Sequence, residues 1–239
     1  MARALYRFQL YYNLFSVSIG FEDVDILRIF MGNYEPWEVE EIVCIYTFVK
    51  AKFNQVFDGI HCDVHPENPR FEDQRRPPTP NEAFDFDHAW NRNFLLDGTV
   101  SRGLELLHDV IFKIKDHAHL VSTMQEKISQ AKGYSIEVVL DETTQSIRRD
   151  EHPSDQDLKQ ERRDSLPFQG DSAELPPLAW TVIWHGTYSN LFGWYVKDPI
   201  RLWGYIMWDA ARLEYTGARG LLVRQWKEFW KDFDPRDDL

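Results

Sequence analysis

The stretch that decides the fold reads Trp203-Gly-Tyr-Ile-Met-Trp-Asp-Ala-Ala-Arg-Leu-Glu214, inside a tryptophan-rich C-terminal third. Asp198 and Pro199 precede it as a helix cap and a first-turn proline, and Gly217 follows it as a helix stop. Apolar side chains recur three and four residues apart on two faces of the helix that this pattern predicts. Because such a helix is usually buried between neighbours, we interpret the run as packing rather than chemistry.

Helical periodicity extends over most of the remaining chain. Apolar residues at helical spacing predict helices over 2–15, over 36–57 and over 104–133, with the second helix ended by Asp58 and Gly59. Residues 135–140 have strand-like propensity but no evident partner strand. The sequence therefore predicts a mainly α fold, an irregular helical domain with aromatic-rich C-terminal helices.

Composition divides the chain into three parts. Residues 1–140 form an N-terminal helical part, and residues 178–239 form a Trp-rich helical part. Residues 141–177 are dense in charged and polar residues, so they cannot bury enough apolar surface to offset the entropy of ordering. We expect them to be a disordered acidic insertion, with the two flanking parts packed as one globular unit.

Charge and cysteine content exclude several classes of protein. The net charge of −12 argues against general binding of nucleic acid or anionic membranes, which attract Lys and Arg. Two cysteines do not make a disulfide framework, and no apolar run is long enough to span a bilayer. We expect a cytoplasmic or nuclear protein that needs no cofactor.

One short motif has the composition of a metal site. His61, Cys62 and His65 lie within five consecutive positions, and Cys44 could join them, because Cys and His are good zinc ligands. However, the motif stands at the start of a Pro-rich connector over 61–81, and no second close pair follows it. The alternative interpretation is a polar loop with incidental histidines.

Two other groups of residues could carry catalysis. An acidic cluster with one histidine could act in acid–base chemistry, although solvated loop charges are commoner; its members are Glu82, Asp85, Asp87 and His88. His185 stands four residues before Ser189, but the motif and the strand–turn–helix context of a nucleophile elbow are missing around them.

The C-terminal aromatic residues also suggest a binding surface for a partner. Tryptophan and arginine are enriched at binding hot spots, and the candidates are Trp194, Arg201, Trp208 and Arg212. The alternative is that the tryptophans are core residues. In the acidic segment, Ser165 follows two arginines and is a candidate for phosphorylation.

Three runs resemble one family of proteins: 203–214, the opening 3–15, and Pro36-Trp-Glu38 before an acidic helix start. They look like the region that follows the F-box in a large group of uncharacterised filamentous-fungal F-box-like proteins. The resemblance implies a region of a ubiquitin-ligase adaptor that recognises a substrate or partner. No F-box is visible in this sequence, so we expect a link to a Skp1-type adaptor only if an F-box lies upstream.

Taken together, these patterns predict a non-enzymatic protein-interaction domain, with the F-box-like adaptor as its narrower form. The alternative is a metal-dependent or hydrolytic enzyme that uses His61, Cys62 and His65, or His185.

Overall fold

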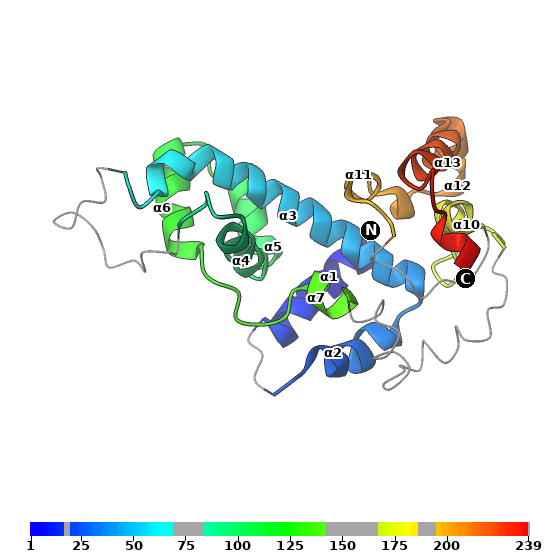
Figure 1. The fold of residues 1–239 in the computed structure, drawn as a ribbon, viewed down its shortest axis with the longest axis horizontal. Helices are drawn as coiled ribbons and strands as arrows, with labels where there is room; N and C mark the ends of the chain where they lie inside the picture. The colour runs from blue at the N-terminus through cyan, green and yellow to red at the C-terminus, as the bar shows by residue number, and fades with distance from the viewer. Residues whose placement is uncertain (17–19, 69–83, 142–166, 186–194, 239) are drawn as a thin grey trace. The chain divides into compact units, whose positions relative to one another are not determined.

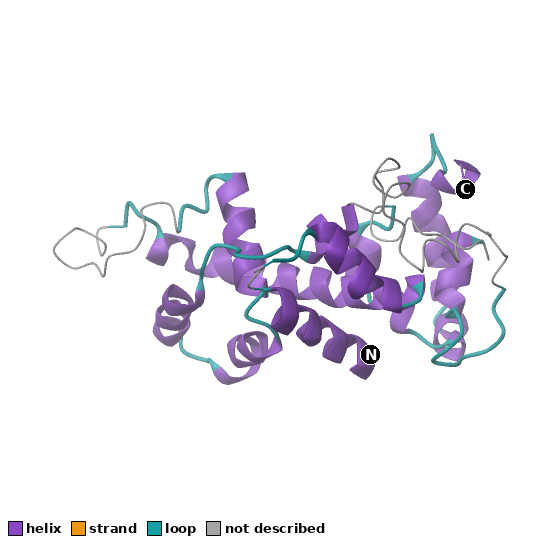
Figure 2. Ribbon diagram, turned by 90° about the horizontal axis from the view of Figure 1, so that it is seen from below, coloured by secondary structure: helices purple, strands orange, loops and turns teal. Residues whose placement is uncertain are grey.

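The computed structural model describes residues 1–16, 20–68, 84–141, 167–185 and 195–238. Within these ranges every regular element is helical and no strand is present, as the colours of Figure 2 show. The prediction of a mainly α fold is therefore confirmed. Most of the expected insertion lies outside the described residues, and the expected three-part division stays a prediction.

The chain forms two compact units from five alternating segments. Unit 1 contains Met1–Ala4, Gly20–Thr47 and Ile136–Leu239, and unit 2 contains Leu5–Ile19 and Phe48–Ser135. Two helices contribute residues to both units: α1 (Ala2–Phe15) and the long helix α3 (Pro36–Val64). Figure 1 draws α3 from blue to cyan.

Three tryptophans in tilted and edge-to-face contact lie in the core of unit 1. Besides its parts of α1 and α3, its helices are α2 (Asp23–Ile29), η1 (Met31–Asn33), α7 (Ile136–Asp141), α10 (Leu178–Trp184), α11 (Asp198–Leu202), η5 (Tyr205–Met207), α12 (Ala210–Tyr215), α13 (Ala218–Phe229) and η6 (Pro235–Asp238). The ring of Trp184 on α10 lies 5.6 Å from that of Trp180 and 5.3 Å from that of Trp226 on α13. All three are buried, so α10 and α13 pack together through aromatic side chains.

A carboxylate fixes the end of this tryptophan row. The indole Nε1 of Trp226 donates to Asp234 over 3.3 Å, and Arg236 Nε donates to the same carboxylate over 2.9 Å. Burial acts to raise the pKa of Asp234, but these hydrogen bonds outweigh it and hold the pKa below its usual value. The Asp234 carboxylate is thus stabilised in its charged form.

The run 203–214 does not form the single buried helix that its sequence predicts. Helix α11 ends at Leu202, Gly204 takes a left-handed conformation with φ of 65°, and the chain continues as η5 and then α12. Glycine adopts this conformation without the steric cost of a Cβ, and Asp209 caps the new helix by accepting a hydrogen bond from the Arg212 backbone N–H at 2.7 Å. The run therefore forms short helical turns, interrupted by the left-handed Gly204 and begun again at the cap Asp209.

Residues 136–141 form helix α7 rather than the strand-like segment suggested by their propensity. Ile136, Val139 and Leu140 are buried and stand three and four residues apart, which places them on one helical face. Helix α7 packs beside α2 in unit 1. Tertiary packing therefore overrides the β-propensity of the branched residues.

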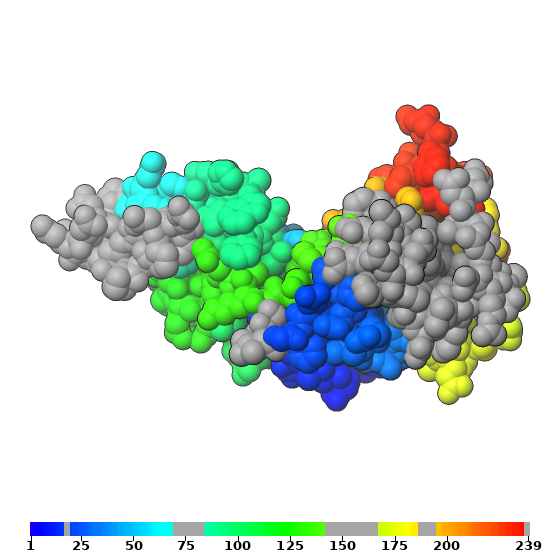
Figure 3. Space-filling model, turned by 60° about the horizontal axis from the view of Figure 1, so that its bottom comes forward, coloured from blue at the N-terminus to red at the C-terminus, as the bar shows by residue number. Residues whose placement is uncertain are grey.

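Unit 2 joins parts of α1 and α3 to a set of shorter helices: α4 (Ala89–Val100), α5 (Leu104–His108), the π-turn η3 (Asp109–Lys113) and α6 (His117–Lys127). Figure 3 draws residues 84–135 of this unit in shades of green. The single helix expected over 104–133 is wrong, because Asp116 caps a new helix by accepting from the His119 backbone N–H at 2.9 Å.

Close backbone contact in unit 2 requires a glycine in α4. A Cβ added to Gly98 would lie 2.0 Å from the backbone oxygen of Ser129 and 2.7 Å from the backbone nitrogen of Ala131. By contrast, a Cβ added to Gly59 on α3 would meet no atom within 4 Å. The segment after α6 therefore packs directly on α4 at Gly98.

Helix α3 continues beyond the point where the sequence predicts its end. It runs through Gly59 to Val64, because Phe57, Ile60 and Val64 extend the buried face of the helix by two further turns. A glycine inside a helix costs only about 1 kcal/mol relative to alanine, and this burial offsets it. The correction moves His61 from the expected connector onto a helix.

Candidate functional site

A groove of about 700 Å³ opens on unit 1, where parts of α3, α7, α11 and α13 meet. Its apolar lining comes from Val43, Val138, Leu140, Val196, Pro199 and Phe229. Two of these side chains are exposed to solvent: Val138 is 47% exposed and Phe229 is 42% exposed. The volume lies in the range of sites that accept a small ligand or a few side chains of a peptide.

Carboxylates outnumber cations in the lining of the groove. Glu137 and Asp141 come from α7, and Asp198 is the exposed first residue of α11. Lys197 also lines the groove, and its Nζ lies 4.3 Å from the ring centroid of Trp230. The groove therefore combines apolar walls with an acidic edge.

Beside the groove lies a buried ion pair. Arg201 donates to Glu40 from Nε at 2.9 Å and from a terminal nitrogen at 3.0 Å, and the two side chains are 7% and 0% exposed. Burial acts to lower the pKa of Arg201, but Glu40 raises it above its usual value. Burial, followed by the charge of Glu40, raises the pKa of the neighbouring Cys44 thiol and Tyr205 phenol. Arg201, a candidate for partner binding, thus connects α11 to α3.

The two other partner-binding candidates within the described residues lie together. The guanidinium of Arg212 is 4.2 Å from the ring centroid of Trp208, and Trp203 packs against Trp208 with centroids 5.0 Å apart. Trp208 is half-buried and Arg212 is exposed. The Asp209 carboxylate accepts a hydrogen bond from the Arg212 backbone N–H, and within the described residues it does not pair with the Arg212 guanidinium. Trp194, the fourth candidate, lies outside the described residues.

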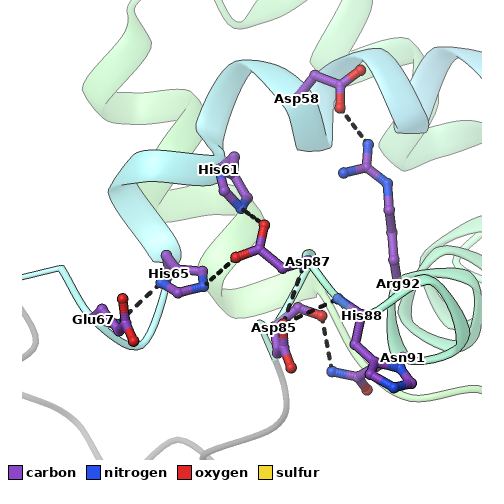
Figure 4. Close-up of polar contacts among 9 residues, drawn as sticks. All are labelled: Asp58, His61, His65, Glu67, Asp85, Asp87, His88, Asn91 and Arg92. Atoms are coloured by element: carbon purple, nitrogen blue, oxygen red, sulfur yellow. Dashed lines mark hydrogen bonds and ion pairs between the residues drawn. The ribbon is translucent and has the colours of Figure 1, made fainter.

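In unit 2, the structure brings His61 and His65 together with Asp87 (Figure 4). His61 Nε2 lies 3.0 Å from Asp87 Oδ1, and His65 Nε2 lies 3.1 Å from Asp87 Oδ2. The thiol of Cys62, expected beside the two histidines, is exposed and is not part of this cluster. Cys44 is not part of it either, because it is buried against Glu40 in unit 1.

Local hydrogen bonds and a ring stack position Asp87. The Asp85 carboxylate accepts from the backbone N–H groups of Asp87 and His88, and Asn91 donates to the Asp85 carbonyl at 3.0 Å (Figure 4). Phe86 is buried and stacks on Phe57 of α3 with centroids 4.5 Å apart. The turn therefore docks on α3 and presents Asp87 to the histidines one helical turn further along.

The remaining candidates stand apart from these two sites. His185 ends α10 in a left-handed conformation; burial, and then the charge of Arg236, lower its pKa. Ser165, Ser189 and Glu82 lie outside the described residues. His88 lies in the Asp85 turn but is not one of the converging groups.

Sequence reasoning missed two features. It placed Asp87 in a separate acidic cluster, although the apolar Phe84 and Phe86 on either side of Asp85 signal that this segment docks on the core. The sequence analysis also missed the groove. Helices α7 and α11 both line it but are more than fifty residues apart in the chain, and no local sequence pattern predicts such a contact.

Comparisons with known proteins give no family. No protein-family model, no curated protein and no solved structure matches the chain. A search of the described helices for a membrane-spanning segment finds none with the length and apolar character to cross a bilayer.

Proposed function

We propose that the chain is a non-enzymatic protein-interaction domain whose groove on unit 1 binds a short partner segment with apolar and basic side chains. The groove carries this proposal, because it has the volume for two or three side chains and an apolar lining. The exposed Phe229 and Val138 would supply the apolar contact with the partner.

Charge complementarity selects the chemistry of the partner. Glu137, Asp141 and Asp198 line the groove, and the chain as a whole carries a net charge of −12. The charge of Arg201 is balanced by Glu40, so the acidic edge dominates what a ligand meets. A segment that places Lys or Arg beside its apolar residues fits both properties.

The resemblance to F-box-like proteins supports a narrower form of the proposal. In that form, the domain is the partner-recognition region of a ubiquitin-ligase adaptor, and the bound segment belongs to the protein that is to be modified. Binding of a Skp1-type adaptor belongs to this form only when an F-box lies upstream. The metal-dependent alternative has the cluster of His61, His65 and Asp87 in unit 2 in its favour.

A peptide-display selection on the full chain tests the proposal. We expect random-peptide phage to enrich sequences that combine large apolar residues with Lys or Arg. The Phe229→Ala substitution should weaken the selected peptides about tenfold, as loss of an interface hot spot does. Asp198→Asn should weaken them less and should reduce their dependence on salt.

Matched substitutions outside the groove serve as controls. Phe233→Ala removes a ring that is 51% exposed and does not line the groove, and Glu228→Gln removes an exposed charge next to Phe229. Both should leave affinity unchanged. The proposal fails if no basic and apolar sequence is enriched, or if the control and groove substitutions have equal effects.

A further inference from the structure

Three potential metal ligands converge on the surface of unit 2, at the end of α3. The imidazoles of His61 and His65 face the carboxylate of Asp87, and one ligand atom from each residue lies within 4.8 Å of the others (Figure 4). From this geometry we propose that His61, His65 and Asp87 form a binding site for a divalent transition-metal ion of the zinc class.

The distances suit a metal of this size. Ligand atoms about 2.0–2.1 Å from a tetrahedral Zn²⁺ lie roughly 3.3 Å from one another. The two imidazole–carboxylate separations, 3.0 and 3.1 Å, are already close to that edge length. Each imidazole Nε2 would coordinate the ion in place of its contact with Asp87, so small side-chain rotations are enough to form the site.

The protein holds the ligands in place before a metal arrives. His61 and His65 stand four residues apart at the end of α3, the spacing that puts two imidazoles on one helical face. Asp87 is fixed by the Asp85 turn and by the stack of Phe86 on α3. Binding therefore requires little ordering of the backbone.

The donor set selects the class of ion. Two imidazole nitrogens and one carboxylate oxygen favour Zn²⁺, Co²⁺ or Ni²⁺, whereas Mg²⁺ and Ca²⁺ prefer oxygen ligands throughout. The side chain of Asp87 is 69% exposed, so water has access to a fourth coordination position.

Metal binding requires a change at His65. The Glu67 backbone N–H donates to His65 Nδ1 at 3.2 Å, which leaves Nε2 to carry the proton of a neutral imidazole. Coordination through Nε2 moves the proton to Nδ1 and breaks this exposed hydrogen bond. Adding metal should therefore change the His65 tautomer and the chemical shift of the Glu67 amide. Neither change is expected if the imidazoles only contact the Asp87 carboxylate and bind no metal.

Zinc titration of the chelator-treated full chain by calorimetry tests the proposal. Wild-type protein should bind one more equivalent of Zn²⁺ than the His65→Ala and Asp87→Asn variants, or bind it about 100-fold more tightly. Asp87→Asn is conservative and alters an exposed side chain, so its circular dichroism should match that of the wild type. His88→Ala and Cys62→Ser are the controls, and both should retain the wild-type zinc isotherm.

Two spectroscopic measurements complete the test. Co²⁺ should give the visible bands of a four-coordinate site without a thiolate charge-transfer band, and ¹⁵N spectra should show the His65 proton move to Nδ1 with a shifted Glu67 amide. Failure of the wild type to bind Zn²⁺, or zinc binding that Asp87→Asn and His65→Ala leave unchanged, overturns the proposal. A thiolate band that is lost in Cys62→Ser would also overturn it, because the ligand set would then differ.

Discussion

Replacing Arg201 with methionine should destabilise unit 1 strongly. The substitution keeps much of the length and apolar volume of the side chain but removes the two hydrogen bonds to Glu40, at 2.9 and 3.0 Å. The Glu40 side chain is 0% exposed, so its carboxylate would remain buried without a counter-charge.

The magnitude follows from the burial of the pair. Removing one partner of a buried ion pair costs about 3–5 kcal/mol, because the remaining charge is not compensated. Replacing both residues by apolar ones is often neutral or stabilising. We therefore expect Arg201→Met to lose about 3–5 kcal/mol of unfolding free energy, and Arg201→Met combined with Glu40→Leu to recover most of that loss. Lower pH should also restore part of the stability of the single variant, since the stranded carboxylate can then accept a proton.

Urea unfolding followed by tryptophan fluorescence measures this change in unit 1. Among the eight tryptophans that the structure describes, only Trp90 belongs to unit 2, whereas Trp180, Trp184 and Trp226 are buried in unit 1. Far-UV circular dichroism reports on helices of both units. The two probes will therefore separate a local loss in unit 1 from unfolding of the whole chain.

Arg219→Met is the matched control for this experiment. Arg219 pairs with Glu214 at 2.7 Å, but both side chains are more than half exposed, so the loss should stay below about 1 kcal/mol. The reasoning is refuted if Arg201→Met loses no more than the control, or if the double variant is as unstable as the single one.

Three further outcomes follow from the packing. Gly98→Ala should destabilise the protein by more than about 2 kcal/mol in thermal unfolding because its Cβ would overlap backbone, whereas Gly59→Ala should stabilise it by about 0.5–1 kcal/mol. The lowered pKa of Asp234 contributes stability above about pH 4 that is lost as pH falls through that lowered value, so Asp234→Asn should flatten the fluorescence-detected acid transition. In thiol titration at neutral pH, exposed Cys62 should react in the native protein, and buried Cys44 only after unfolding; equal native rates would contradict the assigned burial.

Sequence periodicity was sufficient to predict the helical class and several helix starts. Pro36 begins α3, and Pro199 stands in the first turn of α11, because proline is favoured there. The cap expected at Asp198 is wrong, since Lys197 is the N-cap and Asp198 is already helical. Gly217 ends α12 as expected. These features depend on local backbone chemistry, which the sequence contains directly.

The errors concern glycines and branched residues, whose effect depends on distant contacts. The sequence predicts that Gly59 ends the helix, but α3 continues because Ile60 and Val64 are buried. The sequence predicts a helical conformation at Gly204, but this residue takes a left-handed conformation and interrupts the helix expected over 203–214. The β-propensity of Val139 predicts a strand, yet the residue is buried in unit 1 as part of helix α7. At Gly59 and at Val139, tertiary packing decides between local states that differ by about 1 kcal/mol.

The candidate sites could be predicted only in part for the same reason. The spacing of His61 and His65 was visible in the sequence, but their meeting with Asp87 depends on how Phe86 docks. Arg201 was singled out for its charge, and only the structure shows that this charge is buried and paired with Glu40 in unit 1.

The alternating segments of the two units determine which unit can fold first while the ribosome makes the chain. Unit 2 has all of its residues once Ser135 has emerged, whereas Glu40 precedes its partner Arg201 by 161 residues. At about 5–20 residues per second, that interval is roughly 8 to 32 s. During this time the nascent chain carries Trp37 and Ile42, which are buried in the finished protein, without the C-terminal helices of unit 1. A chain stalled before Asp198 would thus hold a complete set of unit 2 residues beside an unfinished unit 1, a form that molecular chaperones recognise by its exposed apolar surface.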